Sequence, residues 1–557
     1  MAKLRSQSWF DRREYYSFAR KSTWRAQGWT AEATDAKPII GICNTASDLN
    51  PCNKHFTELV EDVKRGVWAA GGVPAEFPVI SLGEMFLKPT AMLYRNLMSM
   101  DVEEMIRANP IDAVILLGGC DKTIPAMLMG AASADVPAIV VPGGPMLRGT
   151  WRGQTVGSGT DGRKLFDLYR EEKLSEDDME DLACGIARSP GHCMVMGTAS
   201  SMALVAEALG MTLPGAAAWP AVDGRRAAVA EQTGRRAVSM ALDGPKPSEV
   251  MTRAAFENAI TTLMAAGAST NAVVHLLAIA GRLGVPLALD DFEDISKRTP
   301  LLVDAKPHGK YLMEDFAYAG GAPALLQMLG GRIDGSAKTV AGEKIGEAIA
   351  RFKPWPQDVL RHLQDTGGIQ VLRGNLAPDG ALIKSSAASP ELLRHVGRAI
   401  VFESKDEMLE RVNDGSFTPE ASDVLVLRNA GPLGGPGMPE WGQIPMPKSL
   451  LAKGVKDMVR ISDARMSGTS FGTVVLHISP EAAAGGALAA VQTGDQIRLD
   501  VTERKIEVLL SDAAIAERLA KRQPVRQRPS RGYAQLFWDH IEQAHLGCDF
   551  GFLKKEK

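Results

Sequence analysis

Three consecutive residues, Cys120, Asp121 and Lys122, place a thiol, a carboxylate and an amine side by side in the segment GGCDKTIP. The apolar run before it, residues 113–117, predicts a buried strand, and the two glycines let the backbone approach a ligand closely. Thiolates favour iron or zinc and carboxylates favour magnesium, so this pair indicates two different metals. The sequence leaves open the alternative of an ordinary turn between a strand and a helix, with an incidental cysteine.

Other candidate ligands also follow predicted strands. Cys52 lies in the loop after a strand at residues 38–42, and Glu84 follows a strand at residues 77–80. Ligands of open α/β sheets bind beyond the carboxyl ends of the strands. We therefore expect these two side chains and those of residues 120–122 to meet in one crevice.

The elements that must position these residues alternate between strand and helix. Strands are predicted at residues 38–42, 77–80, 113–117 and 138–141. Helices are predicted at residues 57–70 and 123–134, with a short one between them that Asp101 caps and Asn109-Pro110 ends. Thr123 is expected to cap the helix at 123–134, and Pro125 suits its first turn. This βαβ alternation indicates a parallel sheet with helices on its faces.

Further helices are predicted beyond this sheet. The charged residues 163–181 indicate a helix on the surface, and residues 197–209 a buried one. Cys193 precedes the buried helix, whose dipole favours the thiolate form. A helix at residues 254–266 leads into a polar run that is expected to cap the next helix rather than face the crevice: Ser269, Thr270 and Asn271.

The character of the chain changes near Leu372, where we place a domain boundary. The later strands are predicted at residues 399–402, 424–427, 458–461, 473–477, 496–501 and 505–510. The fold class is therefore α/β. Residues 1–372 form an N-terminal domain with a parallel sheet flanked by helices, and residues 373–557 form a β-rich, barrel-like α/β domain.

The composition is that of a soluble protein with more than one domain. The chain has 557 residues, 45% hydrophobic and 23% charged, and a net charge of -3. That charge gives no reason to expect nucleic acid or an anionic membrane as partner. The first residues lack the apolar segment of a signal peptide, and six cysteines without a CxxC pair indicate a reducing compartment. A cytoplasmic location is expected.

Six motifs occur in an order that resembles one enzyme family. They are NPCNKH, GGCDKTIP, HCMVMGTAS, GASTNAVVHLLAIA, GGPGMPEW and DARMSGTSFG. Together they are similar to the dihydroxy-acid dehydratase and sugar-acid dehydratase family, from about residue 38 to the end of the chain. The overall pattern, with the ending GCDFGFL, is more similar to the pentonate (L-arabinonate and D-xylonate) branch than to the branched-chain amino-acid branch.

This resemblance implies two cofactors. Cys52, Cys120 and Cys193 would hold an iron–sulfur cluster, [2Fe-2S] in the sugar-acid branch or alternatively [4Fe-4S]. Mg²⁺ would be held near the oxygen ligands Glu84, Asp121, Glu440 and a carbamylated Lys122. Carbamylation makes physical sense, because a free ammonium would repel the ion, whereas a carbamate supplies an oxygen ligand.

The resemblance also implies the reaction. A 2,3-dihydroxy acid loses its C2 proton to a base, Ser467, and its C3 hydroxyl, and the resulting enol becomes a 2-keto-3-deoxy acid. The residues alone favour another interpretation of Ser467, as an ordinary loop or capping serine. The leading hypothesis is a hydro-lyase acting on a sugar acid. The alternative is the dihydroxy-acid dehydratase of branched-chain amino-acid biosynthesis, which converts 2,3-dihydroxyisovalerate.

The other cysteines and histidines receive mostly structural roles. Cys43 and Cys184 are expected to be buried thiols, and Cys548 has no matching partner. His55 follows a candidate ligand, Cys52, and is a candidate for contact with substrate or cluster. His275 and His477 are assigned to the core or to the layer around the site.

Two other classes of protein are disfavoured, and an assembly is expected. An iron–sulfur electron carrier usually saturates its irons with four cysteines, and a zinc hydrolase needs a histidine pair that this sequence lacks. The aromatic tail and the N-terminal arm predict a homodimer or homotetramer, in keeping with the family.

Overall fold

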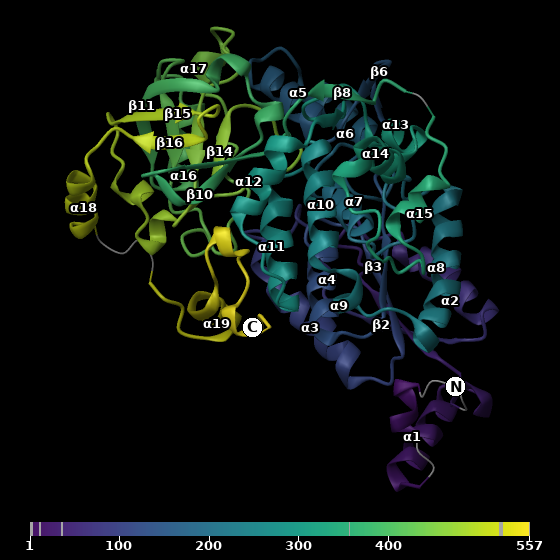
Figure 1. Ribbon diagram of the computed structural model, residues 1–557. Coiled ribbons are helices and arrows are strands. Elements are labelled where there is room, and N and C mark those ends of the chain that lie inside the picture. Colours follow the sequence, from purple (N-terminus) through teal and green to yellow (C-terminus); the bar gives the residue numbers. More distant parts are fainter. Residues whose placement is uncertain (1–3, 11–12, 35–36, 356, 523–526, 556–557) are drawn as a thin grey trace.

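The computed structural model describes residues 4–10, 13–34, 37–355, 357–522 and 527–555, so the extreme ends of the two predicted domains lie outside it. It has a helical domain built around a parallel sheet and, beside it, a β-barrel (Figure 1). The predicted α/β class is confirmed. No helix in the described ranges has both the length and the apolar character needed to cross a membrane.

The sheet of the first domain has four parallel strands in the order β2-β1-β3-β4. β1 and β3 are buried along their whole length, as expected for central strands with helices on both faces. The parallel sheet predicted from the βαβ pattern is thus confirmed. The strands are β1 (Ile39–Asn44), β2 (Val73–Pro78), β3 (Ala113–Gly118) and β4 (Ala138–Pro142).

Helices cover this sheet and form the rest of the domain. Those nearest the sheet and the crevice are α2 (Phe56–Ala69), α3 (Arg95–Ala108), α4 (Thr123–Ala134), α7 (Thr198–Ala208), α8 (Gly224–Asp243), α10 (Arg253–Ala265) and α11 (Asn271–Leu283). Around them lie α1 (Tyr15–Ala26), α9 (Pro247–Val250), α12 (Leu289–Arg298), α13 (Met313–Tyr318), α14 (Gly321–Leu329) and α15 (Ile345–Ala350), with the short strands β5 (Gly149–Trp151), β6 (Gln154–Val156), β7 (Leu301–Val303) and β8 (Leu360–Gln364).

Three local predictions were wrong. Asp101 does not cap a helix but lies inside α3, where its carboxylate accepts a hydrogen bond from the Ile80 N–H at 3.0 Å. Thr123 does not cap α4; it is the first helical residue, and its hydroxyl accepts a hydrogen bond from the Cys120 N–H at 2.8 Å. The single surface helix at 163–181 is two helices, α5 (Thr160–Arg170) and α6 (Glu176–Ile186), because Ser175 starts α6 with a capping box.

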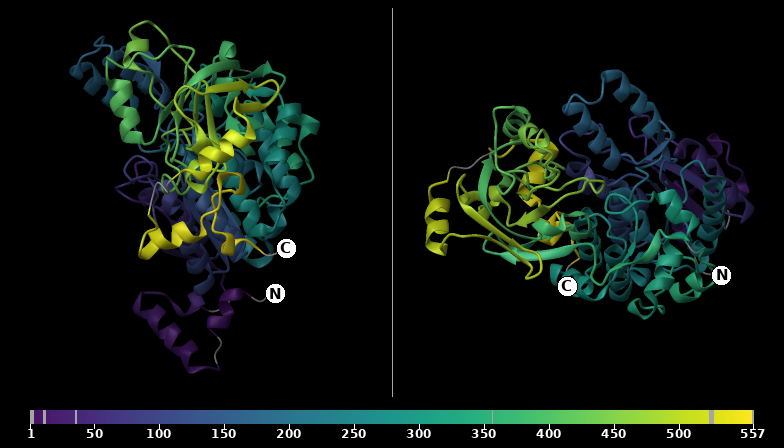
Figure 2. Two further views of the ribbon diagram at one scale, coloured as in Figure 1. Left: turned by 90° about the vertical axis from the view of Figure 1, so that its left-hand side faces the viewer. Right: turned by 90° about the horizontal axis from the view of Figure 1, so that it is seen from above.

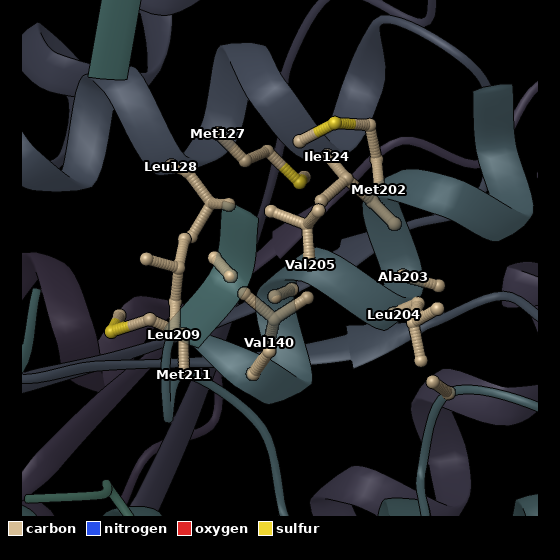
Figure 3. Packing of buried hydrophobic residues seen from close by; sticks show 14 of the residues in the cluster. Ile124, Met127, Leu128, Val140, Met202, Ala203, Leu204, Val205, Leu209 and Met211 are labelled. Atoms are coloured by element: carbon tan, nitrogen blue, oxygen red, sulfur yellow. The ribbon is translucent and has the colours of Figure 1, made fainter. Parts of the chain in front are cut away.

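The core next to the crevice is dense and apolar. α4 and α7 pack together over β4, and their side chains interlock with Val140 at the centre of the group (Figure 3). Met127 and Met202 are fully buried there. Because Cys120 precedes α4 and Cys193 precedes α7, this packing sets the positions from which both thiols enter the crevice.

The second domain is a closed barrel of eight strands in the order β10-β14-β13-β12-β11-β15-β16-β9, which confirms the barrel-like prediction. β11, β12, β13 and β14 are neighbours in the barrel, and each pairs in parallel with the next. The loops after β12 and β13 therefore leave the same end of the barrel. The strands are β9 (Gln370–Gly374), β10 (Ala377–Ile383), β11 (Arg394–Phe402), β12 (Val424–Leu427), β13 (Arg460–Ser462), β14 (Val474–Ser479), β15 (Gln496–Asp500) and β16 (Lys505–Val508). The accompanying helices are α16 (Lys405–Asn413), α17 (Lys448–Leu451), α18 (Asp512–Ala520) and α19 (Gly532–His540).

The two ends of the chain behave differently. After α19 the tail returns to the first domain, where the buried Arg282 and Asp549 form an ion pair with a 2.6 Å contact. At the other end α1 projects away from the body of the domain (Figures 1 and 2) and exposes the aromatic side chains of Tyr15, Tyr16 and Phe18. Packing of either end against a second subunit stays a prediction.

Candidate functional site

The side chain of Lys122 lies at the centre of a buried group of charges. Its ammonium Nζ is 3.1 Å from Glu84 Oε2, 3.3 Å from Asp121 Oδ2 and 3.2 Å from Glu440 Oε1. Lys122 itself is fully buried. Glu84 follows β2 and Asp121 follows β3, whereas Glu440 comes from the barrel in the loop after β12. The side chains expected to meet beyond the strand ends therefore do meet at Lys122, and both domains contribute to the group.

The carboxylates keep Lys122 positively charged. Burial and the nearby Arg465 guanidinium both act to lower the pKa of Lys122, but Glu440, Glu84 and Asp121 outweigh them and raise it above its ordinary value. The ammonium thus neutralises part of the negative charge that three buried carboxylates bring together.

Three residues that the sequence did not single out as site residues hold these carboxylates in place. Thr90 donates its hydroxyl to Glu84 Oε1 at 2.7 Å. Arg465 donates to Glu440 Oε1 at 3.0 Å and to the Thr90 hydroxyl at 3.0 Å, so it links the two carboxylate loops. Asn271 also donates to Glu440 Oε1, at 3.0 Å. The prediction that Asn271 caps a helix was wrong for its side chain, which faces the crevice.

The capping role falls instead to a neighbouring residue. The Ser269 hydroxyl accepts a hydrogen bond from the Asn271 N–H at 3.2 Å, while Thr270 makes no side-chain capping bond at the start of α11. The sequence signal was present, because GASTN was recognised as a polar run, but only packing decides which of its side chains turns inward.

Three of the six thiols share one neighbourhood. The pKa of Cys52 lies well above its ordinary value because of the Cys120 side chain, burial and the Cys193 thiol. Burial and the neighbouring side chains of Asp121 and Cys120 raise the pKa of Cys193 to about 11. The neighbouring groups therefore disfavour ionisation of Cys52 and Cys193, as expected where a cation would be needed to hold thiolates together.

The chemistry of these donors fits the two implied cofactors. Within the described ranges, no three His, Cys, Asp or Glu side chains already stand in a geometry that would hold a metal ion. The soft thiols are nevertheless grouped separately from the hard carboxylates, with Asp121 and Cys120 adjacent at the border. Buried polar atoms without a hydrogen-bond partner lie in the same loops: Asn53 Oδ1, His55 Nδ1, Ser158 Oγ and His192 Nε2.

Ser467 follows Met466, whose carbonyl accepts a hydrogen bond from the Asn271 amide at 3.1 Å. It lies in the loop after β13, and it is the one partly exposed residue in the otherwise buried stretch 465–470. Its hydroxyl is 2.9 Å from the Thr469 hydroxyl and accepts a hydrogen bond from the Thr469 N–H at 3.4 Å. It caps no helix among the described elements, so of the alternative of a loop or capping serine the loop part holds and the capping part does not.

The remaining cysteines divide between core and surface. Cys43 is buried in β1, as predicted, and burial raises its pKa well above the ordinary value. Cys184 was predicted to be buried but is exposed, because α6 turns only Leu182 fully inward. Cys548 is buried, with its sulfur 3.8 Å from the sulfur of Met438.

The histidines near the crevice are neutral. Burial and Arg226 lower the pKa of His55 to about 4, and its Nε2 lies 2.9 Å from the Gly143 carbonyl. His275 is buried with its Nδ1 3.1 Å from Arg95, and burial also lowers the pKa of His477 to about 3. The assignment of these last two to the interior is confirmed.

Comparison with known proteins supports the resemblance over the whole chain. The model for the dihydroxy-acid/6-phosphogluconate dehydratase N-terminal domain matches residues 37–348, and that for the C-terminal domain matches residues 357–548. L-arabonate dehydratase of Azospirillum brasilense is 52% identical over 99% of this chain and 97% of its own. L-arabinonate dehydratase of Rhizobium leguminosarum bv. trifolii (strain WSM2304) is 51% identical over 99% and 96%.

A relative from another branch is more distant. A dihydroxy-acid dehydratase of Caldanaerobacter subterraneus subsp. tengcongensis is 38% identical over 92% of this chain and 94% of its own. The two matched domains together span nearly the whole sequence. The chain therefore belongs to the dihydroxy-acid/6-phosphogluconate dehydratase family, and it is a dehydratase, that is, a hydro-lyase.

Proposed function

We propose that this enzyme dehydrates a 2,3-dihydroxy sugar acid, an aldonate such as L-arabinonate or D-xylonate, to a 2-keto-3-deoxy acid. The observation that carries the proposal is the meeting of both domains at Lys122, where Glu440 of the barrel joins Glu84 and Asp121 of the first domain. Asn271 connects this charge group with the loop of Ser467, because its amide donates both to Glu440 and to the carbonyl of Met466. Two relatives that share about half of their residues with this chain are named for L-arabinonate or L-arabonate, which supports a sugar acid over the branched substrate.

The implied cofactors would be held by residues from both groups. Cys52, Cys120 and Cys193 would bind a [2Fe-2S] cluster, with [4Fe-4S] as the alternative, and the oxygen ligands Glu84, Asp121, Glu440 and carbamylated Lys122 would bind Mg²⁺. When bound, the cluster supplies a Lewis acid for the departing hydroxyl, and Mg²⁺ supplies positive charge for the acid end of the substrate.

Carbamylation explains how Lys122 would change roles. As a free ammonium, its Nζ takes up the position among the three carboxylates where a cation is favourable. A carbamate on Nζ replaces that positive charge with a negative one. Glu84, Asp121 and Glu440 then lack a counter-ion, and the group becomes one that a hard divalent cation satisfies with oxygen ligands.

Ser467 would take the C2 proton. A serine hydroxyl is a weak base at its ordinary pKa, so the alkoxide needs stabilisation. Thr469 offers two donors for this purpose, its hydroxyl at 2.9 Å and its N–H at 3.4 Å from Ser467 Oγ. The partial exposure of Ser467 leaves its hydroxyl open to a substrate in the crevice.

Assembly and location belong to the same proposal. A homodimer or homotetramer is favoured by the exposed aromatic side chains of the projecting α1: Tyr15, Tyr16 and Phe18. A cytoplasmic location is favoured by the six cysteines without a CxxC pair. Sedimentation of the purified protein as a monomer at micromolar concentration would contradict the assembly.

The proposed substrate class is tested with a panel of acids. Purified enzyme is incubated with L-arabinonate, D-xylonate, other aldonates and 2,3-dihydroxyisovalerate, and the formation of 2-keto acid is followed. We expect at least one pentonate to have a kcat/KM well above that of 2,3-dihydroxyisovalerate. Turnover of 2,3-dihydroxyisovalerate alone would instead establish the branched-chain alternative.

The proposed cluster ligands are tested by single replacements. Three single replacements, Cys52→Ser, Cys120→Ser and Cys193→Ser, should each remove the visible iron–sulfur absorption and abolish turnover. The reason is that a distant cysteine cannot take the place of the lost thiol ligand. Cys184→Ser, on the exposed face of α6, is the matched control and should keep both. Full activity of Cys120→Ser without a cluster spectrum would refute the assignment.

The role of Ser467 is tested with substrate that carries deuterium at C2. Ser467→Ala should lower the rate by about 10²–10⁴-fold, the usual contribution of a general base. Binding of substrate and the cluster spectrum should survive, because proton transfer is an interaction of the transition state. Ser416→Ala, on an exposed turn of the barrel domain, serves as control. Exchange of the C2 deuterium at the wild-type rate in Ser467→Ala would point to another base, with His55 next to be replaced.

A further inference from the structure

Helix α5 lies where the two domains meet, at the top of the molecule in Figure 1. Its first turn is fixed against the loop that carries Ser467. The Thr160 hydroxyl donates to the Thr469 carbonyl at 2.7 Å. Gly159, with φ +75°, packs so closely that a Cβ there would lie 2.1 Å from the Thr469 hydroxyl oxygen. The start of α5 therefore borders the crevice at the proposed base.

One turn further along α5 lies Arg163. Its guanidinium interacts electrostatically with Glu440, one of the carboxylates around Lys122, and with the thiol of Cys193. The Arg163 side chain is exposed to solvent, yet enough protein surrounds it that burial lowers its pKa. Solvent, and with it a dissolved ligand, can therefore reach this side chain.

The donors of Arg163 have no partner in the part of the chain that the structure describes: it makes no side-chain hydrogen bond and no ion pair there. Asp167, one turn along α5, is paired with Arg170 at 3.1 Å instead. The other cations at the crevice are occupied. Lys122 contacts three carboxylates, and all three donor groups of Arg465 are bonded, to Met438, Glu440 and Thr90.

We propose that Arg163 binds the carboxylate of the substrate. A guanidinium presents its donors as a planar fork that matches a carboxylate in a bidentate arrangement. The carboxylate is the one formal charge of a 2,3-dihydroxy acid, and its two oxygens have lone pairs for the free donors of Arg163 as well as for the proposed Mg²⁺. The inference rests on the proposed function only in requiring that the substrate is an acid, which both candidate substrates satisfy.

The kinetic test compares wild type with Arg163→Ala, using whichever acid the panel shows to be turned over. Loss of a hydrogen-bonded charge pair of this kind lowers binding affinity by about 10- to 100-fold. KM should rise by that factor while kcat changes little, because the contact is made equally in the ground and transition states. Arg163→Lys, which keeps the charge but loses the fork, should fall between the two.

Two controls separate a direct contact from a general effect of charge. Lys164→Ala removes the neighbouring cation of α5, whose ammonium lies 5.0 Å from the centre of the Phe471 ring, and should leave KM nearly unchanged. The neutral amide of the same acid, used as a competitive inhibitor, should bind wild type and Arg163→Ala with similar Ki. The amide keeps every hydroxyl of the acid, so only the contact with the charge differs.

The outcomes are distinct from those of the substrate panel. An unchanged KM in Arg163→Ala, an equal loss in Lys164→Ala, or an equal loss of amide binding would each overturn the role of Arg163. A panel in which no aldonate reacts overturns the sugar-acid proposal but leaves the Arg163 test intact with 2,3-dihydroxyisovalerate.

Discussion

The contact of one buried ammonium with three carboxylates is the constraint on which the site depends. Glu84 and Asp121 belong to the first domain and Glu440 to the barrel, and Lys122 Nζ lies 3.1–3.3 Å from all three. Removing ions from water is costly unless each is compensated, and loss of one partner from such a group typically destabilises a protein by about 3–5 kcal/mol. The relative position of the two domains at the crevice is therefore tied to the charge state of Lys122.

The surroundings make this arrangement rigid on the side of the sheet. Lys122 and Cys120 stand between β3, which is wholly buried, and α4, which interlocks with α7 in the core (Figure 3). On the side of the barrel, parallel β12 and β13 send two loops to the same end, one with Glu440 and one with Ser467. The loops after β2 and β3 thus bring Glu84 and Asp121, and the loop after β12 brings Glu440, to the Lys122 ammonium.

Protonation in the crevice follows from burial. His55 is neutral at pH 7 because burial and Arg226 hold its pKa near 4, and the pKa values of the Cys52 and Cys193 thiols lie above their ordinary value. The positive charge near Glu440 is carried by Lys122, Arg465 and Arg163 rather than by a histidine. Binding of an anion at this site is then insensitive to protonation of histidine.

The sequence by itself determined the parts of this protein that depend on local pattern. Apolar runs predicted the parallel sheet, and residues placed just after its strands, such as Asp121 and Glu84, predicted where the ligand groups meet, because strand ends share one edge of a sheet. Only the tertiary structure decided the contacts between distant segments. Thr90 and Arg465 are 375 residues apart and meet through one 3.0 Å hydrogen bond. No spacing along the chain signals such a pair, since it arises from how two separately folded domains dock.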